Sequence, residues 1–207
     1  MALGSIITPV RFGATRRRLA PSHAKAERSG SAVLCLAYSG WVEIEVRPAR
    51  WSELTLMEGV FVASARAGWR SVFGKQRLSG LVSDGLPEWG MNGVSVVVAV
   101  VDSDVVGFAS FGPANGEGTA ESWGNVYRLF VHPDWWRHGV GDRLLAAAVD
   151  ALRMASFAEA VLWVWEENAS VRRFYERRGW RADGARTSRT FLGIDVEQIR
   201  YRLRLTV

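Results

Sequence analysis

Residues 125–152 read NVYRLFVHPDWWRHGVGDRLLAAAVDAL, and this stretch decides most of what the sequence predicts about the fold. The apolar run Val126–Val131 is typical of a buried strand. A turn containing Gly139 and Gly141 follows, after which apolar residues recur on one face of a helix as far as Leu152. Backbone N–H groups in the first turn of a helix lack intrahelical partners, and the helix dipole favours negative charge there. The stretch therefore predicts an anion site between a strand and a helix.

The composition indicates a single folded domain preceded by a basic extension. The chain has 207 residues, of which 48% are hydrophobic, enough for one complete core. Residues 1–40 contain six basic residues and one acidic residue, so they carry the whole net charge of +5 and the remainder is neutral. We expect residues 1–40 to be a poorly ordered extension and residues 41–207 to form the domain. Nucleic acid is a disfavoured partner, because a nucleic-acid-binding domain carries its positive charge on the folded part.

Cysteine usage and hydropathy point to a cytoplasmic protein without a membrane partner. Cys35 is the single cysteine, so no disulfide framework is expected. The apolar run Ala32–Tyr38 is far too short to cross a bilayer. His23, His132 and His138 do not have the spacing of metal ligands, so no metal is expected.

Hydrophobic periodicity and turn residues divide the domain into strands and helices. Trp41–Arg47 alternates apolar and polar residues, as a half-buried strand does, and Pro48 ends it. Ser52 is the expected cap of a helix from Glu53 to about Ala67. The other expected elements are a short helix at Phe73–Leu81, a hairpin of Ser95–Val101 with Val105–Phe111, strands at Ala160–Trp165 and Val196–Leu205, a helix at Ser170–Arg178, and loops at Gly112–Gly124 and Asp183–Gly193. We infer an α+β fold with a central mixed, mostly antiparallel β-sheet flanked by helices.

The two glycines of the opening stretch do not by themselves identify the anion. A dinucleotide-binding fold needs a third glycine, and Arg143 or Leu144 stands in its place. A P-loop needs Gly-Lys followed by Ser or Thr, which this turn does not contain. Both nucleotide-binding folds are therefore poor fits.

A second motif, EENASVRRFYERRGW at residues 166–180, narrows the choice. In order, the chain contains Val131 and Pro133, then Gly139 and Gly141 opening a helix, and later Asn168 followed by Phe-Tyr-Glu-x-x-Gly-Trp. With these residues the chain resembles the GNAT superfamily of N-acetyltransferases over residues 42–205. The resemblance implies the GNAT fold, in which the sheet is splayed between the two strands that grip the cofactor.

The resemblance also implies a binding site for acetyl-CoA as co-substrate. The pantetheine arm would pair with backbone groups of Phe130 and Val131, in the splay between the strands ending at Val131 and Trp165. A bulge near Val131 would free an N–H group to stabilise the oxyanion that forms. Asn168 would hydrogen-bond the arm or order the following helix. The pyrophosphate would bind backbone N–H groups of Arg137, His138, Gly139, Val140, Gly141 and Asp142.

One position departs from the family pattern. Trp136 stands where the family has Gln or Arg, three residues before Gly139. An interaction that such a side chain makes with the phosphate would here be supplied by Arg137 or Arg143, or not at all.

Tyr175 is the candidate general acid that the resemblance implies. A phenol has a pKa of ~10 and a thiol of ~8.5, so proton transfer to the departing thiolate is mildly uphill and feasible. The alternative is that Tyr175 and Phe174 are core residues of an amphipathic helix. Glu121 is the candidate general base, and Glu117, His132, a water chain or an already neutral amine are alternatives.

The acceptor pocket is expected to use the amino-terminal helices and the loops at 112–124 and 183–193. Trp69, Arg70, Trp89 and Trp123 are candidate substrate-binding residues, although Trp69 is equally compatible with core packing. Aromatic residues suit an amine on an apolar or aromatic body. A small metabolite, an aminoglycoside-type drug, a polyamine and a peptide amine all remain open as acceptors.

The function predicted from the sequence is an N-acetyltransferase in which a primary amine directly attacks acetyl-CoA in a ternary complex. No covalent enzyme intermediate is expected, since Cys35 lies in the extension and no Ser/His/Asp set is visible. The alternatives are a catalytically silent acyl-CoA-binding sensor or scaffold and, less favoured, a nucleic-acid binder. A homodimer formed through the last strand is also open.

Overall fold

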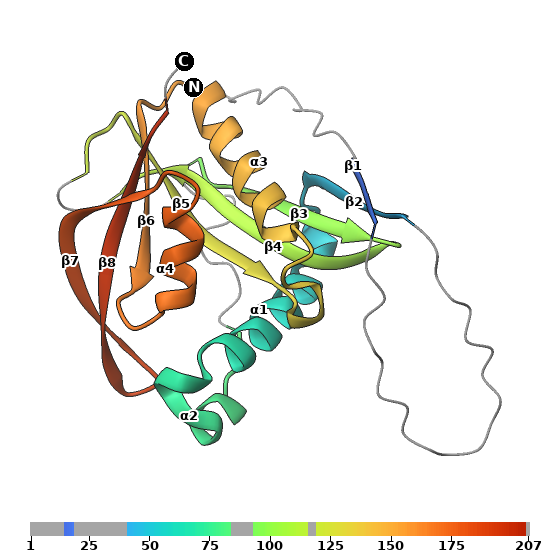
Figure 1. Ribbon diagram of the computed structural model, residues 1–207, viewed down its shortest axis with the longest axis horizontal. Helices are drawn as coiled ribbons and strands as arrows, with labels where there is room; N and C mark the ends of the chain where they lie inside the picture. The colour runs from blue at the N-terminus through green and yellow to red at the C-terminus, as the bar shows by residue number, and fades with distance from the viewer. Residues whose placement is uncertain (1–14, 19–40, 84–92, 116–118, 206–207) are drawn as a thin grey trace, which may run out of the picture.

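One open sheet organises the protein (Figure 1). The computed structural model describes residues 15–18, 41–83, 93–115 and 119–205. The strands are β1 (Thr15–Arg18), β2 (Trp41–Pro48), β3 (Ser95–Val101), β4 (Asp104–Pro113), β5 (Trp123–Val131), β6 (Glu159–Trp165), β7 (Arg181–Phe191) and β8 (Ile194–Arg204). The helices are α1 (Leu54–Gly68), α2 (Arg70–Ser79), α3 (Val140–Met154) and α4 (Ala169–Glu176), with short 3-10 helices η1 (Trp51–Glu53) and η2 (Pro133–Trp135). The strand order is β1-β2-β3-β4-β5-β6-β8-β7, and only the described pair β5 and β6 is parallel, which confirms the mixed, mostly antiparallel sheet.

The predicted extension is described only at Thr15–Arg18, which pairs with β2 as the edge strand β1. The division into an extension and a domain therefore stays a prediction, and Cys35 lies outside the described residues. Among the helices of the described part of the chain, none has the length and apolar character needed to cross a membrane.

Most predicted elements are present within a few residues of their expected bounds. β3 spans Ser95–Val101 as predicted, and β4 follows it in a hairpin. The strand and helix of the opening stretch are β5 and α3. The short second helix begins earlier than predicted, at Arg70, and is kinked at Gly74, whose φ of 72° is left-handed.

Two predictions about local structure are wrong. The expected loop at Asp183–Gly193 is mostly β7, which pairs with β8 and has a register shift between Ala182 and Arg186. Its side chains are all exposed or half-buried, so this edge strand lacks the apolar alternation that marks a strand in the sequence. Ser52 does not cap α1 but lies within η1. The Glu53 carboxylate instead accepts hydrogen bonds from the Arg50 backbone N–H (2.8 Å) and the Arg47 guanidinium (2.6 Å).

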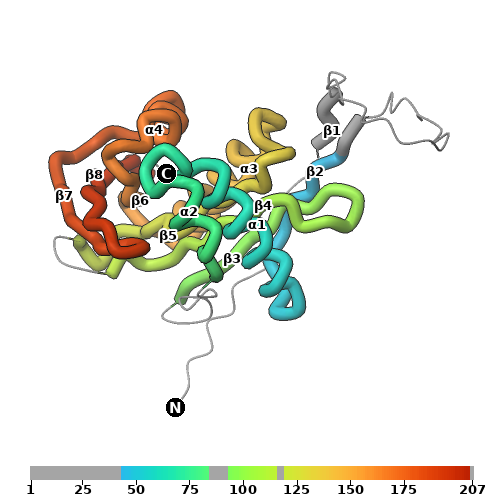
Figure 2. The backbone as a smooth tube through the Cα atoms, turned by 90° about the horizontal axis from the view of Figure 1, so that it is seen from below, coloured from blue at the N-terminus to red at the C-terminus, as the bar shows by residue number. Residues whose placement is uncertain are grey.

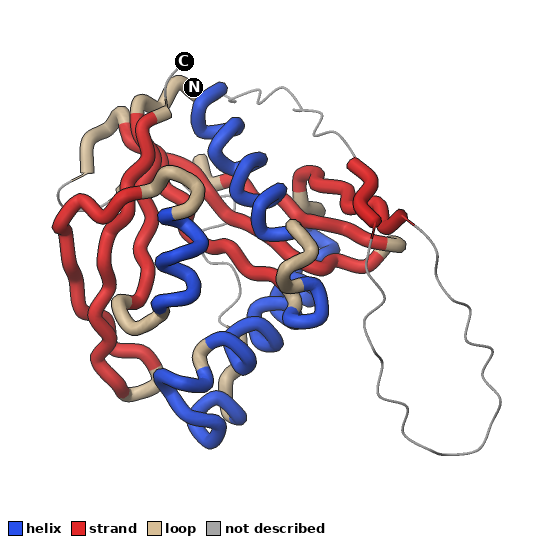
Figure 3. The backbone as a smooth tube through the Cα atoms, in the orientation of Figure 1, coloured by secondary structure: helices blue, strands red, loops and turns tan. Residues whose placement is uncertain are grey.

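The sheet separates two hydrophobic cores. Figure 2 shows α3 and α4 along one face and α1 toward the other, and Figure 3 shows the same helices against the strands. Successive residues of β3 alternate between the two cores: Val97 and Ala99 pack on the α3 side, and Val96 and Val98 pack on the α1 side. Burial on both faces explains why this strand is an uninterrupted apolar run.

The sheet splays between β5 and β6 (Figure 1). These strands pair only from Trp123 to Asn125 of β5, opposite Glu159–Val161 of β6. The register of β5 against β4 shifts immediately afterwards, so that Tyr127 is the extra, bulged residue. The bulge expected near Val131 is therefore wrong, because Val131 pairs in register with Gly107. A bulge increases local bend and twist, which turns β5 away from β6 directly after their last pair.

Candidate active site

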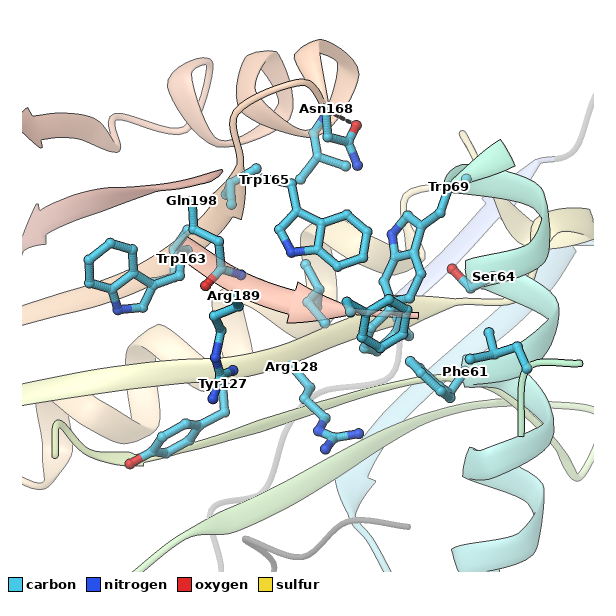
Figure 4. A pocket seen from close by; sticks show the side chains of 18 of the residues that line it. Phe61, Ser64, Trp69, Tyr127, Arg128, Trp163, Trp165, Asn168, Arg189 and Gln198 are labelled. Atoms are coloured by element: carbon cyan, nitrogen blue, oxygen red, sulfur yellow. Dashed lines mark hydrogen bonds between the residues drawn. The ribbon is translucent and has the colours of Figure 1, made fainter. Parts of the chain in front are cut away.

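The splay opens into a groove of about 730 Å³. One wall is β5 and the other is β6, and residues from α1, α4 and the β7–β8 hairpin close it (Figure 4). Because β5 and β6 no longer pair here, backbone groups of β5 face the groove instead of a neighbouring strand. An extended ligand arm can therefore pair with β5 as an added strand does. The described lining includes Phe61, Ser64, Trp69, Tyr127, Arg128, Phe130, Trp136, Trp163, Trp165, Asn168, Tyr175, Arg189, Phe191 and Gln198.

The turn before α3 has the backbone geometry of an anion cradle. Arg137 and Gly139 both have left-handed conformations, with φ of 63° and 83°. Gly139 is the N-cap of α3 and supplies no capping side chain, so the N–H groups of the first turn are left for a ligand. Nδ1 of His138 is buried without a hydrogen-bond partner in the described residues. The first-turn N–H groups and the His138 side chain together suit a phosphate ligand.

Contacts with α4 hold this turn in place. Gly141 faces the Phe174 ring of α4, and a Cβ added there would lie 3.5 Å from that ring, an ordinary van der Waals distance. The Arg178 guanidinium stacks 3.6 Å from the centre of the same ring and donates a hydrogen bond to Asp142 (2.6 Å). The Asp142 carboxylate is therefore neutralised by Arg178, and only its backbone N–H suits an anion.

Trp136 takes a structural position at the end of β5. Its indole Nε1 donates a hydrogen bond to the Val131 carbonyl (2.7 Å), and its ring reaches the end of α1 at Gly68. Arg143 does not compensate for the missing Gln or Arg, because it donates to the Ile44 carbonyl of β2 (3.2 Å). Of the two arginines suggested by the sequence, the exposed Arg137 is the one on the turn itself.

Tyr175 is both a packed residue and a residue of the groove. It is 7% exposed and packs edge-on against Phe174 and Trp180, with ring centres 5.1 and 5.9 Å away. It lines the groove, and no described residue hydrogen-bonds its hydroxyl. Burial raises the pKa of Tyr175 far above its ordinary value of 10.0, so the phenol stays protonated at neutral pH.

Asn168 orders the helix that carries Tyr175. Its Oδ1 accepts hydrogen bonds from the Val171 backbone N–H (3.3 Å) and the Ser170 hydroxyl (3.1 Å), which makes it the N-cap of α4. It also lines the groove. Of the two roles expected from the sequence, the geometry supports the capping role directly.

An aromatic cluster closes the groove between α1 and β6. The ring centres of Trp69 and Trp165 are 4.3 Å apart, and Phe191 lies edge-on to Trp69 at 5.3 Å (Figure 4). Trp163, Trp165 and Phe191 were not among the residues expected at the site. The alternation along β6 could have placed both tryptophans on one face, whereas Phe191 lay in a predicted loop.

The structure does not bring every expected residue to the groove. Glu121 is exposed in the turn before β5, and Arg70 is exposed at the start of α2. Trp123 is half-buried beside the groove and contacts the guanidinium groups of Arg200 and Arg202 at 5.3 and 5.4 Å. Trp89 and Glu117 lie outside the described residues.

A splayed mixed sheet with an anion cradle and a groove between its parting strands defines the class of acyl-CoA-binding acetyltransferase folds. Residues 69–180 match the model of the acetyltransferase (GNAT) family. The chain belongs to this family. It is 31% identical over 112 residues to a probable N-acetyltransferase of Mycobacterium tuberculosis, and the match covers 54% of this chain and 61% of that protein. It is 28% identical to an uncharacterised N-acetyltransferase of Bacillus subtilis, over 62% of this chain and 75% of that one.

Solved structures share the fold. The N-acetyltransferase paia of Thermoplasma acidophilum, in complex with coenzyme A, has a TM-score of 0.60 and 16% identity, covering 78% of this chain and 98% of that chain. The structure of yncA from Salmonella typhimurium with its cofactor acetyl-CoA has a TM-score of 0.59 and 19% identity, covering 79% and 94%. The GNAT fold expected from the sequence is thereby confirmed.

Proposed function

We propose that this protein is an N-acetyltransferase that moves an acetyl group from acetyl-CoA to a primary amine. The observation that carries the proposal is the groove along the unpaired edge of β5, which is lined by Tyr175 and Asn168 and lies next to the cradle at α3. Coenzyme A combines an anionic pyrophosphate with an extended amide arm. The cradle at the start of α3 suits the pyrophosphate, and the unpaired edge of β5 suits the amide arm.

The residues that would hold acetyl-CoA follow from their places in the fold. Backbone N–H groups between Arg137 and Asp142 would bind the pyrophosphate, with the exception of the His138 N–H, which donates to the Trp135 carbonyl (3.4 Å), and His138 Nδ1 would be an additional polar contact. Backbone groups of Phe130 and Val131 would pair with the arm, and Trp136 would fix the Val131 carbonyl. When bound, acetyl-CoA supplies an activated acetyl carbon: the amine nitrogen bonds to it, the carbon–sulfur bond breaks, nitrogen loses a proton and sulfur gains one.

Tyr175 is the group of this chain that would supply the proton to sulfur. Tyr175 lines the groove, and its hydroxyl has no competing partner among the described residues and is kept neutral by burial. A phenol with a raised pKa is a weaker acid, but burial also raises the pKa of a thiol leaving group at the same place. Tyr175 would thus hold its proton until thiolate forms beside it.

Direct transfer in a ternary complex is the arrangement that the groove favours. Its described lining contains neither cysteine nor histidine, so it does not bring together a nucleophile and a base for a covalent enzyme intermediate. The β5 wall and the aromatic end offer separate places for donor and acceptor. Because Glu121 lies away from the groove, we propose that the amine enters in its neutral form.

The test is release of free thiol from acetyl-CoA in the presence of a wide panel of amines. A transferase releases thiol in proportion to an acetylated product identified by mass spectrometry. A silent acyl-CoA-binding module would bind acetyl-CoA in calorimetry and release no thiol with any amine, and that result would exclude the proposed activity. Gly139→Val is the matched binding variant, since a β-branched residue is strained at φ 83° and would weaken binding of coenzyme A.

A further inference from the structure

We infer that the acceptor is a small amine that carries a carboxylate on an apolar body, and that Arg189 binds this carboxylate. The inference rests on the proposed transferase function and names the chemical class of its acceptor. It excludes polyamines and aminoglycosides, which carry several positive charges.

Within the described lining of the groove, the charged side chains are all positive. Its described lining contains two charged side chains, Arg128 of β5 and Arg189 of β7, and neither aspartate, glutamate nor histidine. Both arginines lie on the side of the Trp69–Trp165 pair away from Asn168 (Figure 4). The Gln198 amide and the Trp163 indole N–H lie on the same side, together with the Tyr127 hydroxyl, which already donates to the Pro113 carbonyl. An anion is the ligand that such a set of donors recognises.

Arg181 and Arg189 are the arginines of the β7–β8 hairpin for which no carboxylate partner is found among the described residues, and of these two Arg189 lines the groove. Arg186 pairs with Glu166 (2.6 Å), Arg200 with Asp183 (2.8 Å) and Arg202 with Glu159 (3.2 Å). Arg189 lies on the same hairpin, lines the groove and has no such ion pair. A guanidinium forms a planar, bidentate pair with a carboxylate, so a carboxylate of the acceptor would complete the pattern.

The same charges suit the chemistry of the amine. Only a neutral amine has the electron pair that forms the new bond. Nearby positive charge disfavours a second positive charge, so Arg189 would lower the pKa of the bound amine. A carboxylate on the acceptor offsets the repulsion that a simple ammonium ion would meet on entry. A polycation carries no carboxylate to offset this repulsion, so it would be excluded from the groove.

The aromatic cluster and the volume of the groove limit the size of the apolar body of the acceptor. Trp69, Trp165 and Phe191 form an apolar end to the groove, which suits a hydrocarbon or aromatic substituent. The volume of about 730 Å³ must hold the acyl-bearing arm as well as the acceptor. The remaining space fits a molecule the size of an amino acid better than a folded protein segment.

The experiment compares amines that differ only in the carboxylate. Phenylalanine and phenethylamine form one matched pair, and leucine and isopentylamine form a second. Phenylalaninamide controls for the basicity of the amine, and spermidine represents polycations. Initial rates of thiol release at saturating acetyl-CoA give kcat/KM for each. We expect the carboxylate-bearing member of each pair to exceed its partner by about tenfold to a hundredfold, the contribution of a charged hydrogen-bonded pair.

Variants assign the preference to Arg189. In Arg189→Gln the kcat/KM of phenylalanine should fall by about tenfold to a hundredfold, chiefly through KM, whereas that of phenethylamine should fall much less or rise, because its ammonium form no longer meets this positive charge. Arg189→Lys should retain part of the preference. Arg181→Gln, an exposed arginine of the same strand outside the groove lining, should retain all of it. Equal or faster acetylation of the amines without carboxylate, or the same decrease for both amines in Arg189→Gln, would overturn the inference.

A binding measurement separates this inference from the proposed function. With coenzyme A bound, the fluorescence of the groove tryptophans is titrated with N-acetylphenylalanine and with N-acetylphenethylamine. If no amine releases thiol but the anionic compound binds more tightly and loses this advantage in Arg189→Gln, the anion site stands and the transferase function fails. If thiol is released while neither rate nor binding depends on the carboxylate, the transferase function stands and the acceptor class is wrong.

Discussion

Two buried tyrosines, Tyr175 and Tyr201, should respond in opposite ways to removal of their hydroxyl groups. The Tyr175 hydroxyl has no hydrogen-bond partner among the described residues, so Tyr175→Phe removes no internal hydrogen bond and keeps the ring contacts with Phe174 and Trp180. Its free energy of unfolding should change by less than about 1 kcal/mol. If the phenol donates the proton to sulfur, kcat should fall by about 10²–10⁴.

Tyr201→Phe is the matched control. Tyr201 is 1% exposed, accepts a hydrogen bond from Arg172 Nε (3.1 Å) and donates one to Glu176 (2.7 Å). Removing both bonds to charged partners should destabilise the fold by about 2 kcal/mol. For a chain of this length the midpoint of thermal unfolding would then fall by about 4–8 °C. Because Tyr201 does not line the groove, kcat should stay within about twofold of the wild type at a temperature where both are folded.

Chemical denaturation gives the stabilities and thiol release gives kcat. A kcat of Tyr175→Phe equal to that of the wild type over the whole pH range would refute the assignment of the general acid.

The raised pKa of Tyr175 also predicts how the stability of the protein depends on pH. The folded state holds this proton more tightly, so its stabilising effect is complete below pH 10 and is lost as pH rises through the folded pKa. Above about pH 10 the wild type should lose up to ~1.4 kcal/mol per pH unit more than Tyr175→Phe.

Three further substitutions test the packing and capping that support the site. Gly107→Ala should destabilise the fold by about 1–3 kcal/mol, because its Cβ would lie 2.9 Å from Leu144 and 3.0 Å from the Phe130 carbonyl. Gly59→Ala in α1, where a Cβ would meet nothing within 4 Å, should be neutral or stabilising. Equal midpoints of urea unfolding for the two variants would contradict this account. Glu53→Gln should cost about 1–3 kcal/mol at pH 7 and less at pH 3, since hydrogen bonds from Arg47 lower the pKa of Glu53 and its contribution is lost as pH falls through that folded pKa. Asn168→Ala should cost about 1 kcal/mol while Asn168→Ser retains the cap, as measured by thermal unfolding, and equal destabilisation by both would show that the cap is unimportant.

The parts of the fold that the sequence predicts well are those in which burial constrains residue type. β3 is apolar from Val96 to Val101 because each face meets a core, and the helix α3 repeats its apolar face toward the sheet. The cradle was predictable for another reason: Gly139 adopts φ 83°, a conformation for which glycine is the natural choice.

The parts that escaped prediction are those that exposed polar residues or backbone register determine. β7 exposes both faces, so its residues resemble those of a loop, and Arg189 was hidden within that predicted loop. The bulge at Tyr127 follows from how β5 and β4 align, which no residue type marks. The acceptor side joins α1, β6 and β7, segments far apart in the chain, so spacing along the sequence could not select Trp165 over Trp123.

The short contact between β5 and β6 has a mechanical consequence. In the described residues, the pairs from Trp123 to Asn125 and the adjacent hydrogen bond from the Ala158 N–H to the Ser122 carbonyl (2.8 Å) join the two halves of the sheet through the backbone. Beyond these contacts the sheet has a deep slit. Strain between the halves concentrates at the closed end of that slit, where Gly124 packs under Leu152. The extended arm of a bound coenzyme A would pair along the slit, hold its two edges together and make the sheet more rigid. After that ligand left, the two halves would again be free to spread, and the next donor and acceptor could enter without the unfolding of a helix.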